Sequence, residues 1–386
     1  MNSRMNTHHF INRQLTSRIH QRLFKGKTII MYGPRQSGKT TLIQSLLSGY
    51  KEKTIEFNGD ESDIRELLSD NNSAKIKLMI GNNKIVFIDE AQRIQNIGIT
   101  LKLIHDQLKD VQIIATGSSS LELASETSES LTGRKFEFLL LPFSFQELVD
   151  HHGLLAEKRI LEHRLIFGQY PDIVNSKEDA KELVKLLADS YLYKDILTIE
   201  SIKRPSLLDK ILKALSFQIG SEVSYREIGQ LVGANGQTVE RYINLLEKTF
   251  VVFQLPAFSR NLRNEIKRGI KIYFYDNGIR NAVINNFAPL PNRNDIGALW
   301  ENYLISERMK CFRFENYSAN RYFWRTTQQQ EIDYIEEKEG KLFAYEFKWN
   351  PKKAKKRFSQ TFTNAYKDAS CQVITSSNYD EFLMNC

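Results

Sequence analysis

Short apolar runs alternate with amphipathic stretches through the first third of the chain. The apolar runs KTIIMYG, KIVFIDEA and VQIIATGSSS have the composition of strands, and the segments at 38–49 and 99–110 have helical spacing. Strands that alternate with helices are typical of parallel βαβ units. We therefore expect a three-layer α/β core in this part of a multidomain α/β protein.

The pattern changes after about residue 140. Amphipathic helical stretches follow at 144–153 and 180–197, and residues 221–259 predict two short helices, a tight turn and strand-like residues. The last hundred residues return to mixed α/β, and the segment APLPNRND before them predicts a loop. We divide the chain into an α/β core, a helical segment, a helix pair with a wing, and a second α/β domain, at 1–145, 146–205, 206–268 and 269–386.

The motif GPRQSGKT matches G-x-x-x-x-G-K-[ST] and stands between an expected strand and an expected helix. Glycines let backbone N–H groups wrap around a phosphate, and the helix N-terminus adds a favourable dipole. We expect Lys39 to pair with the β- and γ-phosphates of ATP and Thr40 to ligate Mg²⁺. The predicted nucleotide-binding residues are Gly33, Pro34, Arg35, Gln36, Ser37, Gly38, Lys39, Thr40, Thr41, Asp89, Thr116 and Ser118.

The strand IVFIDEA carries the acidic half of such a site. Asp89 at the strand end is expected to hold Mg²⁺, and Glu90 is expected to polarise the attacking water. This part of the chain is predicted to bind and hydrolyse ATP. Thr116 and Ser118 follow the next strand and suit a sensor of the γ-phosphate, with a simple Ser/Gly turn as the alternative.

Arg134, in the segment LTGR, precedes another expected strand. An arginine there can act on a phosphate of its own chain or reach the site of a neighbouring subunit. With Lys39 and Glu90, it completes the predicted catalytic set. An ordinary surface arginine is the alternative interpretation.

The motifs GPRQSGKTTL, FIDEAQ, TGSSS, LTGR and PFSFQEL resemble the AAA-type ATPases of bacteria and archaea that carry a C-terminal domain of unknown function and are related to archaeal and STAND ATPases. The segments GQYPDIV, KIYFYDNGIRNAV and EIDYIEEKEGKLFAYEFKWN extend the resemblance over the whole chain. It implies a P-loop AAA-like core with a helical lid and favours Arg134 as a finger or sensor. Such ATPases commonly assemble into rings, so the resemblance also implies a homo-oligomer.

Residues 224–259 predict a winged helix-turn-helix. Ser224 and Asn235 are expected to cap two helices joined by a glycine-containing turn, with Ile228 and Leu231 facing inward on the first helix. In a DNA reader the start of the second helix faces the nucleic acid. The predicted DNA contacts are Gln237, Thr238, Arg241, Arg260 and Arg263, with Tyr242, Lys267, Arg268 and Lys271 as further candidates. A protein-contact or spacer module is the alternative.

The stretch KLFAYEFKWN raises the question of why an apolar strand carries Glu346 and Lys348. Side chains alternate along a strand, so these two share one face, and Asp333 on the partner strand of a hairpin can lie opposite them. With Glu301 on the preceding helix, the set resembles a PD-(D/E)xK, restriction-endonuclease-like site that holds Mg²⁺. A structural Glu–Lys pair on an exposed sheet face is the alternative.

Composition adds a modest constraint on partners. The 386 residues contain 54 Lys and Arg against 46 Asp and Glu, and the net charge of +8 permits a polyanionic partner such as DNA. No apolar run approaches the ~20 residues that cross a bilayer, so we expect a cytoplasmic protein with no membrane partner. Two hypotheses remain: an ATP-driven, DNA-associated enzyme with a nuclease-like domain, and a STAND-like nucleotide switch that binds a protein partner.

Overall fold

The computed structural model describes residues 10–118, 127, 130–198, 204–259, 269–315, 319–326, 328–354 and 358–385. The chain divides into two compact units. The first contains residues 1–143, 191–202 and 248–250, and the second contains residues 144–190, 203–247 and 251–386. Among the described helices, none is both long and apolar enough to cross a membrane.

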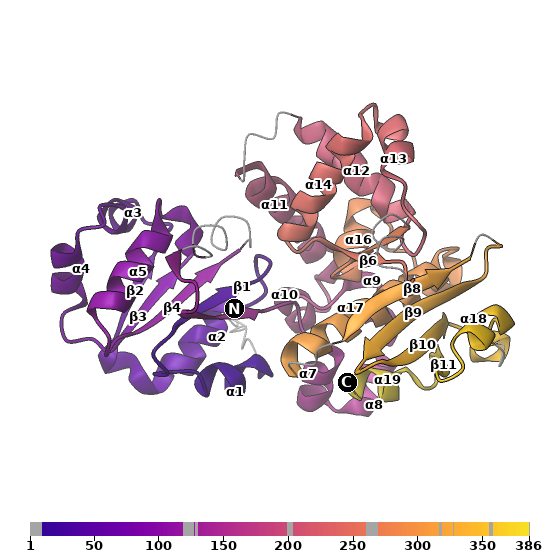
Figure 1. Ribbon diagram of the computed structural model, residues 1–386, viewed down its shortest axis with the longest axis horizontal. Coiled ribbons are helices and arrows are strands. Elements are labelled where there is room, and N and C mark those ends of the chain that lie inside the picture. Colours follow the sequence, from indigo (N-terminus) through magenta and orange to yellow (C-terminus); the bar gives the residue numbers. More distant parts are fainter. Residues whose placement is uncertain are drawn as a thin grey trace, which may run out of the picture. The chain divides into compact units, whose positions relative to one another are not determined.

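The first unit is built on a five-stranded parallel sheet (Figure 1), which confirms the predicted α/β core. Strands β1 and β4 are buried along their whole length, which explains why they read as continuous apolar runs. Across the sheet the order is β2 (Thr54–Asn58), β3 (Ile85–Asp89), β4 (Gln112–Gly117), β1 (Thr28–Tyr32) and β5 (Lys135–Leu139).

The helices of the first unit connect these parallel strands. Their apolar residues are buried, as in α5, where Ile97, Leu101 and Ile104 repeat at helical spacing. The five described helices before residue 110 are α1 (Leu15–His20), α2 (Lys39–Leu46), α3 (Ser62–Ser69), α4 (Ser73–Ile80) and α5 (Ile97–Gln107).

The second unit contains a separate C-terminal sheet. Strands β8, β9 and β10 are antiparallel and β11 runs parallel to β10, while the long helix α17 packs against β10 (Figure 1). The predicted hairpin at residues 331–348 is confirmed. The elements are α17 (Ile296–Glu315), β8 (Asn320–Arg325), β9 (Glu331–Lys338), β10 (Lys341–Lys348), α18 (Gln360–Ala365), β11 (Ser370–Thr375) and α19 (Tyr379–Met384).

Both faces of this C-terminal sheet are covered. On one face Leu342 and Ala344 join a core cluster with Trp324 and Phe362. On the other face the ring of Phe347 packs at a tilt against that of Phe382 in α19, with the ring centres 5.6 Å apart. Buried apolar area on two faces is what lets a four-stranded sheet form a stable layer.

Helices from the middle of the chain pack onto this C-terminal region. Gly278 approaches the carbonyl of Phe167 so closely that a Cβ atom would lie 2.0 Å from that oxygen. The backbone N–H of Phe145 donates to the buried carboxylate of Glu307, 162 residues away. The helices are α7 (Phe145–His152), α8 (Leu154–Arg159), α9 (Leu161–Phe167), α10 (Pro171–Asn175), α11 (Ala180–Thr198) and α16 (Asn277–Val283).

This packing differs from the predicted separate helical segment at 146–205. The apolar spacing of these helices predicted their presence correctly. It could not show their partner, because α9 packs on α16, more than a hundred residues later. Residues 144–190 therefore belong to the same unit as the C-terminal sheet.

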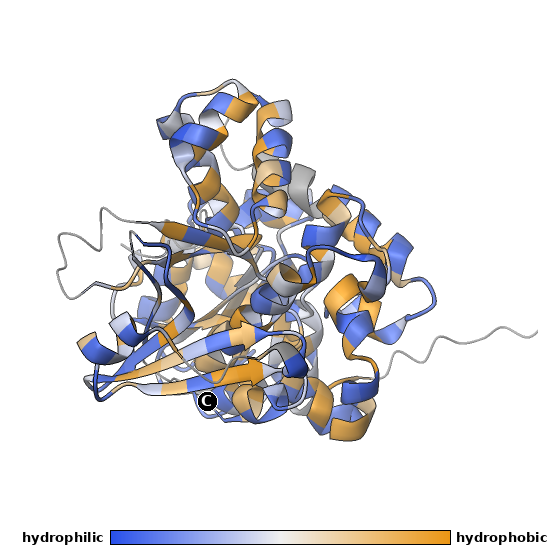
Figure 2. Ribbon diagram, turned by 90° about the vertical axis from the view of Figure 1, so that its right-hand side faces the viewer, coloured by the Kyte–Doolittle hydropathy of each residue, from blue (hydrophilic) through white to orange (hydrophobic). Residues whose placement is uncertain are grey.

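Three helices and a two-stranded ladder form the remaining part of the second unit. Ser224 accepts from the backbone N–H of Glu227 (3.3 Å) and Asn235 accepts from that of Thr238 (2.7 Å), so both predicted caps are present. Figure 2 shows hydrophobic and hydrophilic turns on the helices at the top of the view. The elements are α12 (Pro205–Phe217), α13 (Tyr225–Val232), α14 (Gly236–Lys248), β6 (Val252–Pro256) and β7 (Ile270–Phe274).

Two expectations about this region are wrong. Leu231, expected to face inward, is 70% exposed, because α13 turns only one narrow face around Ile228 toward the core. The predicted domain boundary between residues 268 and 269 would separate β6 from β7, but these two strands pair in one antiparallel ladder.

Buried arginines hold the loop before α17 to α16. Asp295 accepts hydrogen bonds from Arg293 (2.8 Å) and Arg280. Burial raises the pKa of Asp295, but the hydrogen bonds from the two arginines outweigh it and lower this pKa to about 2. A carboxyl group with a lowered pKa stabilises the fold fully above its unfolded pKa of ~3.9, and this contribution is lost as the pH falls toward 2.

We predict that Asp295→Asn lowers the free energy of unfolding at pH 7 by about 1–3 kcal/mol, because hydrogen bonds to a charged group are lost. The deficit relative to the wild type should shrink as the pH is lowered from 4 toward 2, where the wild-type carboxylate becomes protonated. Urea unfolding at several pH values measures both quantities. A deficit that stays constant over this range contradicts the assignment.

Candidate nucleotide-binding site

The phosphate loop connects β1 to α2 and depends on its glycines. Gly38 has φ of 90° and comes directly before α2. At Gly33 a Cβ atom would lie 2.1 Å from the carbonyl oxygen of Leu140, so only glycine fits without moving the backbone. The loop is therefore held against the segment that follows β5.

The ammonium group of Lys39 lies inside this loop. Its Nζ donates to the carbonyl oxygens of Gly33 and Pro34, each at 2.9 Å, and the side chain is buried. An ammonium group has three donors and no acceptor. It can exchange these carbonyl oxygens for phosphate oxygens with little movement, as the predicted role requires.

Asp89 joins three elements at the carboxyl edge of the sheet. Its Oδ2 accepts from the hydroxyl of Thr40 at 2.7 Å, and its Oδ1 accepts from the hydroxyl of Thr116. The predicted residues Thr40, Asp89 and Thr116 thus meet. Hydroxyl and carboxylate oxygens are hard ligands that suit Mg²⁺, so this donor set fits the ion that the motif implies.

Glu90 stands beside this group and is positioned by a residue that the motif analysis missed. Glu90 has φ of 48°, in the left-handed region. Gln92 Nε2 donates to Glu90 Oε2 at 2.6 Å and to the hydroxyl of Ser118 at 3.1 Å. The amide of Gln92 therefore connects the expected catalytic carboxylate to the end of β4. The motif DEAQ contains Gln92, but spacing alone gives its amide no role.

Arg13 is a second residue that the sequence did not reveal. Its guanidinium donates to the carbonyl oxygens of Ser37 (3.2 Å) and Leu141, and it lies 4.5 Å from the centre of the Phe143 ring. The side chain is buried. Arg13, twenty residues before Gly33, thus holds the phosphate loop through the carbonyl oxygen of Ser37.

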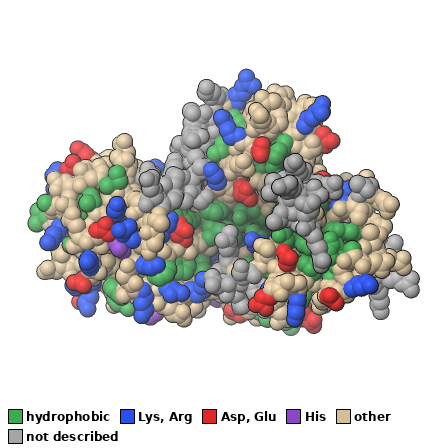
Figure 3. Space-filling model, viewed as in Figure 1, with side chains coloured by type: hydrophobic (Ala, Val, Ile, Leu, Met, Phe, Trp, Pro, Cys, Tyr) green, Lys and Arg blue, Asp and Glu red, His purple; other side chains and the backbone are tan. Residues whose placement is uncertain are grey.

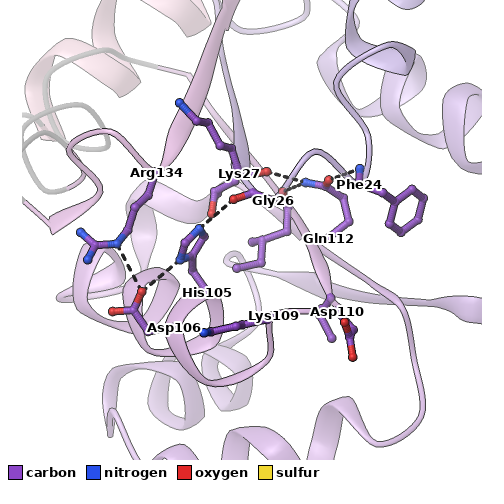
Figure 4. A pocket seen from close by; sticks show the side chains of 12 residues that line it. Phe24, Gly26, Lys27, His105, Asp106, Lys109, Asp110, Gln112 and Arg134 are labelled. Carbon is purple, nitrogen blue, oxygen red and sulfur yellow. Dashed lines mark hydrogen bonds and ion pairs between the residues drawn. The ribbon is translucent and has the colours of Figure 1, made fainter.

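Arg134 lies at the opposite edge of the sheet. Its carbonyl accepts from the N–H of Thr28 at the start of β1, while the phosphate loop follows the end of this strand. Figure 4 shows Arg134 paired with Asp106 at the rim of a pocket of about 660 Å³. Arg134 therefore lies at the end of β1 that is away from the phosphate loop of its own chain.

In the C-terminal sheet, three of the four residues of the nuclease-like set lie together. Asp333 Oδ2 accepts from the backbone N–H of Phe347 at 2.7 Å and lies 3.6 Å from Lys348 Nζ. Lys348 Nζ lies 3.9 Å from Glu346 Oε2. The β9–β10 register continues to place Asp333 opposite Glu346.

Glu301, the fourth member, has a different partner. Its Oε1 accepts from Lys271 Nζ (3.0 Å) and from the Tyr273 hydroxyl (2.6 Å). Lys271, expected on the surface of a wing, is buried, because it lies on β7 beneath α17 and also contacts Glu331. Among the described residues, no group of three or more His, Cys, Asp or Glu is arranged to hold a metal ion. Glu301 therefore belongs to a different cluster, while Asp333, Glu346 and Lys348 remain a predicted metal site.

The candidate DNA contacts lie at the start of α14. Gln237 and Arg241 are exposed, Thr238 is half-buried, and Tyr242 is buried in the core rather than facing a ligand. Figure 3 shows Lys and Arg side chains over α12–α14 at the top of this face. A pocket of about 610 Å³ is lined by Arg204, Asn235, Thr238 and Arg241, among others. The candidates Arg260, Arg263, Lys267 and Arg268 lie outside the described residues.

Comparisons with known proteins cover the chain in three segments. Residues 25–149 match the model of an AAA domain, and residues 158–290 and 296–383 match two domains of unknown function, DUF8612 and DUF4143. An uncharacterized protein of Mycobacterium tuberculosis is 26% identical over 344 residues (87% of this chain, 73% of the relative). One of Methanocaldococcus jannaschii is 25% identical over 371 residues (90% and 80%).

Solved structures give low similarity over much of the chain. The RuvB Holliday junction branch migration motor of Thermotoga maritima has a TM-score of 0.35 at 16% identity (66% of this chain, 91% of that chain). Cdc6p of Pyrobaculum aerophilum has a TM-score of 0.30 at 12% identity (74% and 97%). The AAA match and the parallel sheet with its phosphate loop support a P-loop AAA-type ATPase domain in residues 25–149.

We predict that Gly33→Ala disrupts the phosphate loop, because the new Cβ atom would overlap the Leu140 carbonyl. The expected cost to the first unit is about 1–3 kcal/mol, typical of overpacking at a rigid site. Gly49→Ala is the matched control, since a Cβ atom there meets nothing within 4 Å. Faster amide hydrogen exchange in β1 and α2 for the first variant alone is expected, and equal exchange in both variants refutes the close-packing argument.

Proposed function

We propose that this protein binds MgATP at residues 33–40, hydrolyses it, and couples the nucleotide state to DNA bound by its second unit. The observation that carries the ATPase proposal is the carboxylate of Asp89. Its two oxygens hold the hydroxyls of Thr40, from the phosphate loop, and Thr116, from the neighbouring strand. The Asp89 side chain thus connects the phosphate loop to β4, where Thr116 can sense the γ-phosphate.

Each residue of the site has a role that follows from its position. Backbone N–H groups of the phosphate loop and the N-terminus of α2 bind the phosphates, and Lys39 neutralises their charge. When bound, Mg²⁺ supplies charge neutralisation at the phosphate oxygens, with Thr40 and Asp89 as its protein ligands. Glu90, whose direction is set by Gln92, orients and polarises the attacking water.

Arg134 enters this proposal through assembly. Since it lies at the opposite edge of its own sheet, beside Asp106, it can serve catalysis only at the site of a neighbouring copy. A homo-oligomer in which one chain presents Arg134 to the next is therefore part of the proposal.

We predict that Glu90→Gln lowers kcat for ATP hydrolysis by roughly 10²-fold or more while leaving ATP affinity nearly unchanged, because the carboxylate acts on water rather than on the nucleotide. Lys39→Ala should instead weaken ATP binding itself. Steady-state hydrolysis together with binding of a fluorescent ATP analogue separates the two effects. Wild-type turnover that Glu90→Gln leaves intact removes Glu90 from the mechanism.

The DNA part of the proposal depends on α12–α14 and the β6–β7 ladder, which we interpret as a winged helix-turn-helix. The start of α14 presents Gln237 and Arg241 to solvent, beside a pocket that also contains Arg204. A recognition helix with exposed amide and guanidinium groups at its N-terminal end suits phosphates and base edges. The surplus of basic residues in the whole chain supports a polyanionic partner.

We predict that Arg241→Ala weakens binding of a mixed-sequence DNA duplex several-fold and lowers the slope of log affinity against log salt by about 1, as expected for one lost phosphate contact. Arg159→Ala is the matched control, since Arg159 is an exposed arginine of the same unit on α8. Fluorescence anisotropy at two salt concentrations measures both quantities. Equal loss in the two variants, or no binding at low salt, contradicts the DNA interface and favours a protein partner, while the ATPase proposal stands.

A further inference from the structure

Lys271 lies at the centre of a buried acidic cluster in the second unit. Its side chain is 1% exposed, and its Nζ contacts Glu301 on α17 at 3.0 Å and Glu331 on β9. The hydroxyl of Tyr273, two residues along β7, donates to the same Glu301 oxygen at 2.6 Å. Three elements that are distant in sequence therefore converge on one ammonium group.

The charges of the cluster stabilise one another. Burial lowers the pKa of Lys271, but the nearby carboxylates of Glu301, Glu331 and Asp333 outweigh it, so the pKa of Lys271 is raised. Burial raises the pKa of Glu301 to about 7, although Lys271 acts in the opposite direction. A charged lysine that is fully removed from water persists only where carboxylates surround it.

Two further carboxylate oxygens of the cluster also have cationic or N–H partners. Glu331 Oε2 lies 3.7 Å from Arg325 Nε, at the rim of the cluster. Asp333 Oδ2 accepts from the backbone N–H of Phe347 and faces Lys348. Arg325 and Lys348 therefore add positive charge beside Glu331 and Asp333.

We propose that Lys271 is the resident cation of this cluster and takes the place of a divalent metal ion. Glu301 and Glu331 then form an ion-pair network with Lys271 that joins the β6–β7 ladder and α17 to the C-terminal sheet. Glu301 then serves this ion-pair network and is not a metal ligand. This inference is independent of ATP hydrolysis and of DNA binding by α14.

Removal of the ammonium group tests directly whether Lys271 takes the place of a metal ion. Lys271→Met keeps the length of the side chain but leaves Glu301 and the half-buried Glu331 without their cation, so the thermal unfolding midpoint should fall by several degrees. Because the vacated space is lined by oxygen atoms, millimolar Mn²⁺ should restore at least half of the loss. The same concentration should raise the wild-type midpoint much less, because only the site at Thr40 and Asp89 is then available to the ion.

Two controls make the rescue specific. Lys341→Met removes an exposed lysine at the start of β10, and its midpoint should stay near that of the wild type with or without Mn²⁺. In the double variant Lys271→Met, Glu301→Gln the Mn²⁺ rescue should disappear, because one proposed ligand is lost. Rescue that survives in the double variant overturns the assignment.

A comparison that needs no lysine variant keeps the proposal falsifiable if Lys271→Met does not fold. Wild type and Glu301→Gln are titrated with Mn²⁺, and the bound ion is counted by electron paramagnetic resonance. Any Mn²⁺ held at Thr40 and Asp89 is common to both proteins and cancels. Equal counts support Lys271 as the resident cation. One additional ion in the wild type, lost in Glu301→Gln, shows that the cluster binds metal and overturns the proposal.

Discussion

The nucleotide site depends on one constraint of parallel sheets: the carboxyl ends of neighbouring strands meet at one edge. Since β4 lies between β1 and β3, Thr116 stands between the phosphate loop and Asp89. The hydroxyls of Thr40 and Thr116 both reach the Asp89 carboxylate for this reason. Everything that the first unit offers to a nucleotide is arranged around this edge, and the opposite edge, with Arg134, is left for other contacts.

The second unit depends on buried charges to a greater extent. Glu307 and Lys310 form an ion pair at 2.6 Å, and Arg308 pairs with Glu336 at 2.7 Å, all of them buried. Ion pairs of this kind contribute little net stability compared with apolar side chains, but breaking one is costly. The first pair lies within α17, whereas the second joins α17 to β9 and so helps to fix the position of the helix on the C-terminal sheet.

The sequence predicted what is local and missed what is distant. The glycines and Lys39 of the phosphate loop, the strand end at Asp89 and the caps at Ser224 and Asn235 are encoded within a few residues. Arg13 and Gln92 were missed because a supporting hydrogen bond leaves no pattern in the sequence. The same limit applies to Lys271: a strand lysine among basic neighbours looks like a surface residue until a distant helix covers it with Glu301.

Long-range pairing also explains why the sequence could not show the partner of Glu301. Alternation along β10 placed Glu346 and Lys348 on one face, and the hairpin brought Asp333 to them, as expected. What alternation cannot predict is a residue that arrives from outside the hairpin. Acidic and basic residues that alternate on a strand predict a metal site and an ion-pair network equally well. The structure distinguishes the two, because it shows which distant side chains reach the carboxylates.

The hydrogen bond between the Phe145 N–H and Glu307 has a consequence for biosynthesis. On the ribosome, α7 emerges long before α17, so its partner carboxylate does not exist until 162 further residues have been added. The sheet of the first unit is complete by residue 139 and can form meanwhile. At ~5–20 residues per second, the apolar face of α7 stays without its α17 partner for roughly 8–32 s. During this interval a chaperone could cover the exposed apolar surface.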